Sequence, residues 1–137
     1  MTTPILLSYR TPPPPPAPAR AISARDWALI AKDPDSHAGE RVVVYGQVKQ
    51  FDAATGTSAF RANVDGVVHK VSYGYADYET NTFLTGPAQL LKDLVNDDLF
   101  RAEVTVTGAY SYDTTMGGNV TAPKLEVTAI KVTGTAK

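Results

Sequence analysis

The feature that most limits how this chain can fold is an alternation of apolar and polar residues, which recurs in short runs between Glu40 and Lys131. Side chains on a β-strand point alternately to opposite faces of the sheet, so each run is typical of a strand with one buried face. We expect five such strands, with one helix inserted between the third and the fourth. That order predicts a small closed barrel.

The first two predicted strands lie on either side of a turn. Strand one is predicted over Arg41–Phe51, and its mid-strand Gly46 indicates a bulge or a tight bend. A turn over residues 52–56 then leads into strand two. Val42, Val44, Gly46 and Val48 share one face of strand one, and Phe60, Ala62 and Val64 are predicted to point inward from strand two. Arg61 and Asn63 face outward.

The remaining elements of the barrel are predicted from turn signals and apolar stripes. Asp65-Gly66 predicts a two-residue hairpin, followed by strand three from Val67 to about Tyr73 and an irregular segment over residues 74–84. Thr85-Gly86-Pro87 then predicts the start of a helix that plugs the barrel. Its buried stripe is predicted to be Leu90, Leu91, Leu94 and Val95. Strand four (Phe100–Gly108), a flexible loop (Ala109–Asn119) and strand five (about Thr121–Val132) complete the prediction.

Two further segments precede the barrel. Residues 11–20 contain six prolines, which favour polyproline II and predict an N-terminal arm or linker over residues 1–20. Ser23 as N-cap, with Asp26 in the capping-box position, then predicts a helix that ends near Lys32. Trp27 in this helix is expected to pack against the barrel. The folded domain is therefore predicted over residues 21–137.

These elements predict an all-β domain with minor α content: a five-stranded barrel of the oligonucleotide/oligosaccharide-binding (OB) type, with a helix between strands three and four and an extra N-terminal helix. OB barrels bind ligands across strands two and three, flanked by the loop after strand one and the loop between strands four and five. The candidate ligand-binding residues on that face are Lys49, Arg61, Asn63, Lys70, Tyr110 and Tyr112.

The sequence also resembles a known but uncharacterised family. The most specific stretch runs from Lys32-Asp33-Pro34-Asp35-Ser36 to Gln50-Phe51-Asp52-Ala53-Ala54-Thr55-Gly56. Over about residues 22–132, the chain is similar to an OB-type, tRNA-anticodon-binding-like domain of actinobacterial proteins and of the phages that infect them. The resemblance implies an OB barrel and no assigned activity. Many relatives carry a membrane segment or lipoprotein anchor before the Pro-rich linker. We find none in this sequence and expect a cytoplasmic location, in the host cytoplasm if the protein is phage-encoded.

Composition argues against several classes of protein. The 13 basic and 14 acidic residues nearly balance, whereas proteins that bind duplex nucleic acid usually carry a basic surplus. The sequence contains no cysteine, which excludes disulfides, thiolate metal sites and cysteine nucleophiles. No apolar run approaches the roughly 20 residues that a membrane-spanning helix needs.

No catalytic or metal-binding motif is apparent either. His37 lies in Asp33-Pro34-Asp35-Ser36-His37, a run with turn composition and without standard metal-ligand spacing. His69 is predicted to be a surface or half-buried residue. The sequence has neither a nucleophile-elbow serine nor a phosphate-cradling glycine loop. We therefore expect a non-enzymatic binding module without a cofactor or a metal ion.

Two functions stay open for such a module. The balanced charge, the Pro-rich arm and the tyrosine-rich loops favour a protein-interaction module, with homo-oligomerisation left open. The alternative is single-stranded nucleic-acid binding through the face of strands two and three. Arg61, Lys70 and Lys49 would supply positive charge there, and Tyr110 and Tyr112 would supply rings for base stacking.

Overall fold

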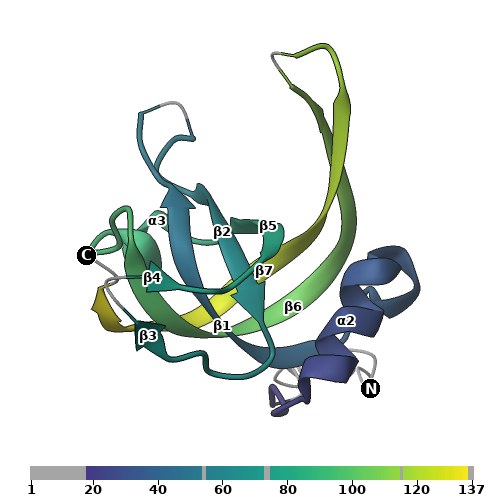
Figure 1. Cartoon of the computed structure of the whole chain (residues 1–137), viewed down its shortest axis with the longest axis horizontal. Helices are drawn as coiled ribbons and strands as arrows, with labels where there is room; N and C mark the ends of the chain where they lie inside the picture. Colours follow the sequence, from purple (N-terminus) through teal and green to yellow (C-terminus); the bar gives the residue numbers. More distant parts are fainter. Residues whose placement is uncertain (1–17, 54, 73–74, 115, 136–137) are drawn as a thin grey trace, which may run out of the picture.

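A computed structural model of the chain describes residues 18–53, 55–72, 75–114 and 116–135, and five of its strands close into a barrel (Figure 1). The barrel strands are β1 (Arg41–Gln50), β2 (Ala59–Asp65), β5 (Thr80–Thr85), β6 (Asp98–Asp113) and β7 (Asn119–Thr135). Their order is β1-β2-β5-β7-β6, and β6 pairs back onto β1. β5 and β7 are parallel, whereas the other neighbours are antiparallel. With α3 (Ala88–Leu91) between the third and fourth barrel strands, this order confirms the predicted OB-type barrel.

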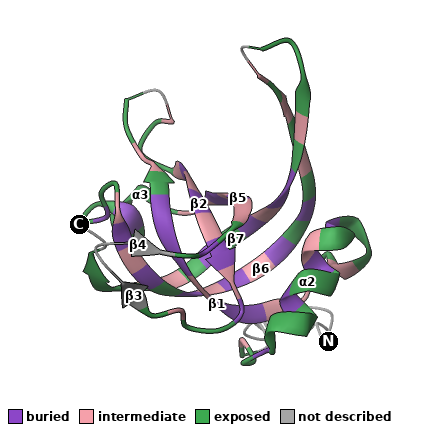
Figure 2. Cartoon of the chain, viewed as in Figure 1, coloured by how far each residue is buried: buried purple, intermediate pink, exposed green. Residues whose placement is uncertain are grey.

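Phe60, Ala62 and Val64, predicted to point inward from β2, are buried, as are Val42, Val44 and Val48 of β1, and Figure 2 shows buried segments along the barrel strands. Phe60 lies at the centre, edge-on to Phe100 with ring centroids 5.8 Å apart. The bulge predicted at Gly46 is wrong, because the register of β1 against β2 shifts between Val48 and Gln50. Gly46 serves a close approach of strands instead: a Cβ there would lie 2.4 Å from the carbonyl oxygen of Asn63.

The prediction for the third barrel strand is wrong. The chain does not turn back at Asp65-Gly66, and β2 pairs with Thr80–Thr85 instead. Gly66 lacks the positive φ that such a hairpin requires, and it lies so close to Ile22 that a Cβ would contact that side chain at 2.8 Å. A long connection joins β2 to β5 over residues 66–79, and its described part, residues 66–72 and 75–79, contains one small hairpin, β3 (Val71–Ser72) with β4 (Tyr75–Ala76).

The side chain of His69 holds the connection in place by bonding to two carboxylates. Its Nε2 lies 2.7 Å from Asp65 Oδ2, and its Nδ1 lies 2.6 Å from Asp77 Oδ1. The imidazole stacks on Tyr78 at 4.3 Å, and the Tyr78 hydroxyl accepts a hydrogen bond from the His69 backbone N–H. His69 is half-buried, as expected, and ties both ends of the connection together.

The inserted helix is shorter than predicted. α3 spans Ala88–Leu91, and Pro87 is its N-cap rather than its first residue. Leu91 and Leu94 are buried in the core, whereas Leu90 and Val95 are exposed, so half of the predicted stripe is wrong. A plug of one helical turn presents only one side to the barrel, and the residues on its other sides face solvent.

The last two strands are longer than predicted. β6 and β7 stay paired out to Asp113 and Asn119, where the sequence predicted a flexible loop over Ala109–Asn119. Gly108 has a φ of 132° and lies at a shift in register between the strands. The paired strands bend there and continue beyond the barrel (Figure 1).

The N-terminal helix is confirmed. α2 (Ala24–Lys32) begins with the predicted capping box of Ser23 and Asp26, and Trp27 is buried against the barrel. Ahead of it, the Arg20 backbone bonds to both Arg41 and Val43 at the edge of β1. Most of the predicted Pro-rich arm, residues 1–17, lies outside the described residues. Within the described ranges, no helix is long and apolar enough to cross a membrane.

Candidate ligand-binding notch

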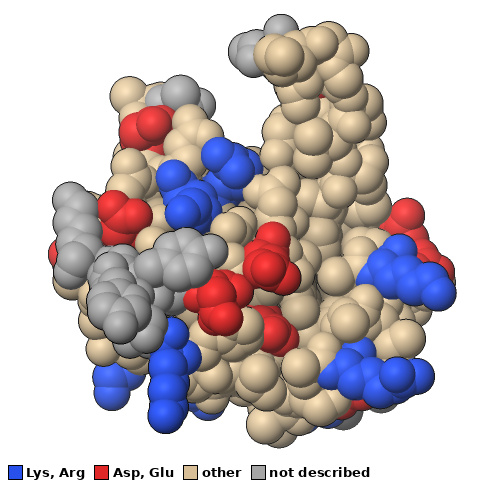
Figure 3. Space-filling view, in the orientation of Figure 1, with Lys and Arg blue, Asp and Glu red and all other residues tan. Residues whose placement is uncertain are grey.

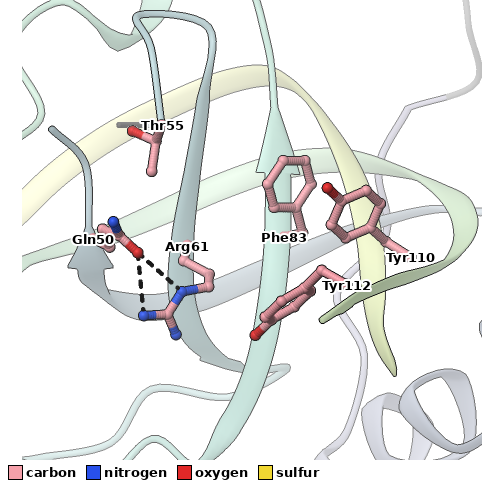
Figure 4. Close-up of a pocket in the computed structure, with 6 residues that line it drawn as sticks. All are labelled: Gln50, Thr55, Arg61, Phe83, Tyr110 and Tyr112. Carbon is pink, nitrogen blue, oxygen red and sulfur yellow. Dashed lines mark hydrogen bonds between the residues drawn. The ribbon is translucent and has the colours of Figure 1, made fainter. Parts of the chain in front are cut away.

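Two projections extend from the same end of the barrel (Figure 1). One is the β1–β2 loop, residues 51–53 and 55–58, here called the loop arm. The other is the outer part of β6 and β7, residues 108–114 and 116–123, here called the hairpin arm. Between them is a hollow of about 410 Å³, here called the notch (Figure 4). It is lined by Gln50, Thr55, Arg61, Phe83, Tyr110 and Tyr112.

Aromatic rings form one side of the notch. Phe83 of β5 and Tyr110 of the hairpin arm lie face to face, with centroids 4.3 Å apart and planes 16° from parallel. Tyr112 is next to Tyr110, at a centroid distance of 5.9 Å. Lys124 Nζ lies 5.7 Å from the centre of the Tyr110 ring, within the range of a cation–π contact. All three rings are half-buried, so part of each remains open to a ligand.

Arg61 of β2 faces these rings across the notch, and neutral amides hold its guanidinium. Its Nε and Nη2 both donate to Gln50 Oε1 at 3.4 Å, and its Nη1 donates to Asn81 Oδ1 at 3.1 Å. Asn81 in turn donates to the Tyr112 hydroxyl oxygen at 2.9 Å. This chain of hydrogen bonds joins β1, β2, β5 and the hairpin arm, and it fixes the orientation of the Asn81 amide.

The bonding pattern leaves donors for a ligand. A guanidinium has five N–H groups, and the described residues accept from three of them, so one on each Nη nitrogen is uncommitted. The Tyr112 oxygen accepts from Asn81, which leaves its own hydrogen free to donate. The notch therefore offers hydrogen-bond donors beside aromatic rings, which suits a flat ligand that carries acceptor oxygens or nitrogens.

Charge is distributed unevenly around the notch. Figure 3 shows basic side chains between the two projections and a group of acidic side chains below them. Asp65 at the end of β2 and Asp77 in the connection are both paired with His69. Among the described residues that line the notch there is no carboxylate and no histidine. The lining therefore favours an anionic ligand over a cationic one, and it presents no base next to a nucleophile.

The structure brings together half of the predicted site residues. Arg61, Tyr110 and Tyr112 all line the notch. Lys49 is exposed at the register shift of β1, outside the lining. Asn63 faces outward from β2 as expected, but its side chain donates to the Tyr78 carbonyl oxygen in the connection.

Lys70 lies in a different element from the one that the sequence predicted. The sequence pattern predicts it on a barrel strand beside Arg61, whereas it lies exposed in the connection between β2 and β5. The prediction is wrong because Asp65-Gly66 has the composition of a hairpin turn without forming one.

Four residues in or beside the notch were not predicted: Gln50, Thr55, Asn81 and Phe83. The signal for the β5 pair was weak, since Thr80-Asn81-Thr82-Phe83-Leu84-Thr85 is rich in strand-forming residues but its two apolar residues, Phe83 and Leu84, are adjacent rather than alternating. Thr82 and Leu84 are buried, and Asn81 and Phe83 face the notch side of the strand.

The histidines and carboxylates of the described ranges do not gather into a group of three that would hold a metal ion. His37 ends the short 3₁₀ helix η1 (Pro34–His37), with Nδ1 2.7 Å from Glu40 Oε2, which confirms the predicted turn. Hydrogen bonds from Arg20 and His37 hold the pKa of Glu40 below its usual value. This cluster lies outside the notch lining.

Comparisons with known proteins add little to the description of the fold and the notch. No family model matches the chain. No curated protein matches it either. Among solved structures it is similar to the mitochondrial single-stranded DNA binding protein Rim1 from S. cerevisiae, at 13% identity and a TM-score of 0.40 over 72% of this chain and 98% of that one. A selenomethionine-labelled crystal of the same protein gives 12% identity and a TM-score of 0.37, over 71% and 97% of the two chains. Similarity this low carries no argument about the ligand of this chain.

Proposed function

We propose that the protein is a non-enzymatic module that binds a short stretch of single-stranded nucleic acid in the notch. The observation that carries the proposal is the placement of Phe83, Tyr110 and Tyr112 opposite the Arg61 guanidinium on one open face. Aromatic rings stack on unpaired bases, and a guanidinium binds phosphate or base acceptors, so this combination fits a strand whose bases are exposed.

The geometry favours a single strand over a duplex. Bases within a duplex are stacked on one another and cannot lie on Tyr110 or Tyr112, whereas the bases of a single strand can. Two cations of the described residues lie next to the rings: Arg61 lines the notch and Lys124 lies over Tyr110. With about two phosphate contacts, the slope of log affinity against log salt is expected near about −1.4 for a single strand.

The protein-interaction module, which the sequence favoured first, stays a prediction. Tyrosine is enriched at protein interfaces and also stacks on bases, so the tyrosines alone do not separate the two functions. The guanidinium supports nucleic-acid binding over protein binding. It is held by Gln50 and Asn81 and retains uncommitted donors, and the described lining of the notch has no carboxylate that would compete with a phosphate.

The proposal is tested by titrating the full chain into fluorescein-labelled single-stranded DNA and RNA of about 12 nucleotides, at about 50 and 200 mM salt. Tyr110→Ala removes a stacking ring and is expected to cost about 1–3 kcal/mol of binding. Arg61→Ala is expected to weaken binding and to make the salt slope shallower by about 0.7.

Arg101→Ala is the matched control, because Arg101 is an exposed arginine on β6 that contacts Glu103 and lies outside the notch lining. Its affinity and salt slope should equal those of the wild type. The proposal fails if the wild type binds neither oligonucleotide at about 50 mM salt, or if Arg101→Ala weakens binding as much as Arg61→Ala does.

A further inference from the structure

We infer that Asp35, which lies outside the notch, is a positioning residue that sets the angle of the hairpin arm and thereby keeps Tyr110 against Phe83. The inference deepens the proposed function and rests on it, because the angle of the arm matters to a ligand only if the ligand binds in the notch. Its structural part, the contact between the two rings, is measurable in the free protein.

The contact that carries the inference lies where the hairpin arm leaves the barrel. Asp35 Oδ1 accepts a hydrogen bond of 2.9 Å from the backbone N–H of Ala109. Gly108, at the register shift, has a φ of 132°, and a Cβ there would lie 2.7 Å from the same carboxylate oxygen. The carboxylate therefore occupies the space that a glycine leaves open at the bend.

The support beneath Asp35 is firmly attached to the barrel. Asp35 belongs to η1, whose Pro34 is buried. Just after η1, the Gly39 N–H donates to the Val106 carbonyl at 2.7 Å, and the Val106 N–H donates to the Glu40 carbonyl at 2.9 Å. Because these bonds fasten η1 to β6 immediately before the bend, Asp35 can fix the direction of the hairpin arm beyond it.

Beyond the bend, the arm is contacted from opposite sides. On the notch side, Tyr110 stacks on Phe83 and the Tyr112 hydroxyl accepts from Asn81. On the other side, Asp35 holds the backbone one residue before Tyr110. A two-stranded ribbon has little stability of its own, so contacts at its base largely determine its orientation.

Loss of the Asp35 bond should let the arm swing and lower the fraction of molecules whose notch is assembled. Apparent affinity falls in proportion to that fraction. Asp35→Ala is therefore expected to raise the dissociation constant for a single-stranded oligonucleotide by about three- to tenfold, although Asp35 does not line the notch.

The experiment compares three variants of the full chain. Asp35→Ala removes the acceptor, and Asp35→Asn restores an amide oxygen at the same position. Ser36→Ala is the matched control: it also removes an exposed side-chain bond within η1, the one to Asp33, which does not reach the arm. Ring-to-ring NOEs between Phe83 and Tyr110 are recorded in the free protein, and oligonucleotide affinity is measured by fluorescence anisotropy.

The inference is supported if Asp35→Ala weakens the ring-to-ring NOEs while Asp35→Asn and Ser36→Ala retain them at wild-type strength. It is overturned if Asp35→Ala retains the wild-type NOEs. Gly108→Ala gives a second approach should Asp35→Ala fold poorly: its Cβ would lie 2.7 Å from the carboxylate at a backbone φ of 132°, so it disturbs both the contact and the bend, and the same NOEs should weaken. If the NOEs respond as expected but the wild type binds no oligonucleotide, the positioning role stands and the proposed function falls.

Discussion

The barrel interior and the notch are built from alternate residues of the same strands, yet they are held together differently. On β2, Phe60 and Ala62 point inward and are fully buried, whereas Arg61 between them points into the notch. The interior is filled by apolar side chains packed against one another. The notch is organised by hydrogen bonds to Arg61 and Asn81 and by stacked, half-buried rings.

This difference separates stability from binding. Interior packing removes apolar surface from water and resists any loss of volume. The side chains of the notch add little to the apolar surface buried on folding, so they are available to contact a ligand. Substitutions of residues that face the barrel interior should therefore change the free energy of unfolding, and substitutions of residues that line the notch should change affinity for the ligand.

The largest effect is expected from Phe60→Ala. Phe60 stacks on Phe51 and meets Phe100 edge-on, with no exposed surface. Removal of the ring leaves a cavity at the centre of the barrel and should cost about 3–5 kcal/mol of the free energy of unfolding. Urea denaturation measures the loss. A cost below about 1 kcal/mol would mean that the centre of the barrel is elsewhere.

A smaller loss is expected from Gly46→Ala, which adds volume where two strands approach closely. The new Cβ would meet the backbone oxygen of Asn63 at 2.4 Å, and backbone cannot move aside as a side chain does. Overpacking of this kind costs about 1–3 kcal/mol of the free energy of unfolding, which urea denaturation also measures.

Gly134→Ala is the matched control, because Gly134 is also a glycine within a strand, here β7. The nearest heavy atom to its Cβ is Leu99 Cδ1 at 3.8 Å, and Gly134 lacks a positive φ. This variant should be neutral or slightly stabilising, because alanine is less costly than glycine to order in a strand. Equal losses in Gly46→Ala and Gly134→Ala would remove close approach as the reason for Gly46.

Much of the interior was predictable from the sequence because burial imposes period-two alternation on β2 and on the barrel part of β6. The third strand was missed because a local turn signal was overridden by a contact between residues far apart in the sequence. Asp65-Gly66 has the composition of a hairpin turn, but the glycine is there to accommodate Ile22, which is distant in the sequence. No local rule reveals that kind of contact.

The notch was only partly predictable for a related reason. Residue type identifies Tyr110 and Tyr112, but the composition of their region predicts a loop because it has no apolar face to bury. Its strands pair beyond the barrel through their own hydrogen bonds. Phe83 was hidden by the misplaced third strand, since its outward direction is apparent only once β5 is recognised.

A still smaller effect, and on binding rather than stability, is expected from Tyr112→Phe. The change keeps the ring and removes the oxygen that accepts from Asn81. Affinity for the single-stranded oligonucleotide should fall by about two- to fivefold, the equivalent of one hydrogen bond of roughly 0.5–1 kcal/mol. The titration used for Tyr110→Ala measures it.

Ser111→Ala serves as the control on the same strand. Ser111 faces away from the notch side of the hairpin arm and bonds to Thr121. It should bind like the wild type. A greater loss of affinity from Tyr112→Phe than from Tyr110→Ala would show that hydrogen bonding, rather than stacking, dominates in the notch.

The smallest effect is expected at His69, in the connection that belongs to neither region. Burial lowers the pKa of His69, but the hydrogen bonds to Asp65 and Asp77 and the charges of those two carboxylates raise it by more, so the net shift is upward. A raised pKa means that folding favours the protonated imidazole. This stabilisation is fully present below the pKa of the unfolded chain, about 6.5, and is lost as pH rises through the higher pKa of the folded protein.

The free energy of unfolding, measured in urea between about pH 6 and pH 8.5, should therefore decline with pH more steeply in the wild type than in His69→Gln. Parallel curves for the two proteins would show that the imidazole is not held in its protonated form by Asp65 and Asp77.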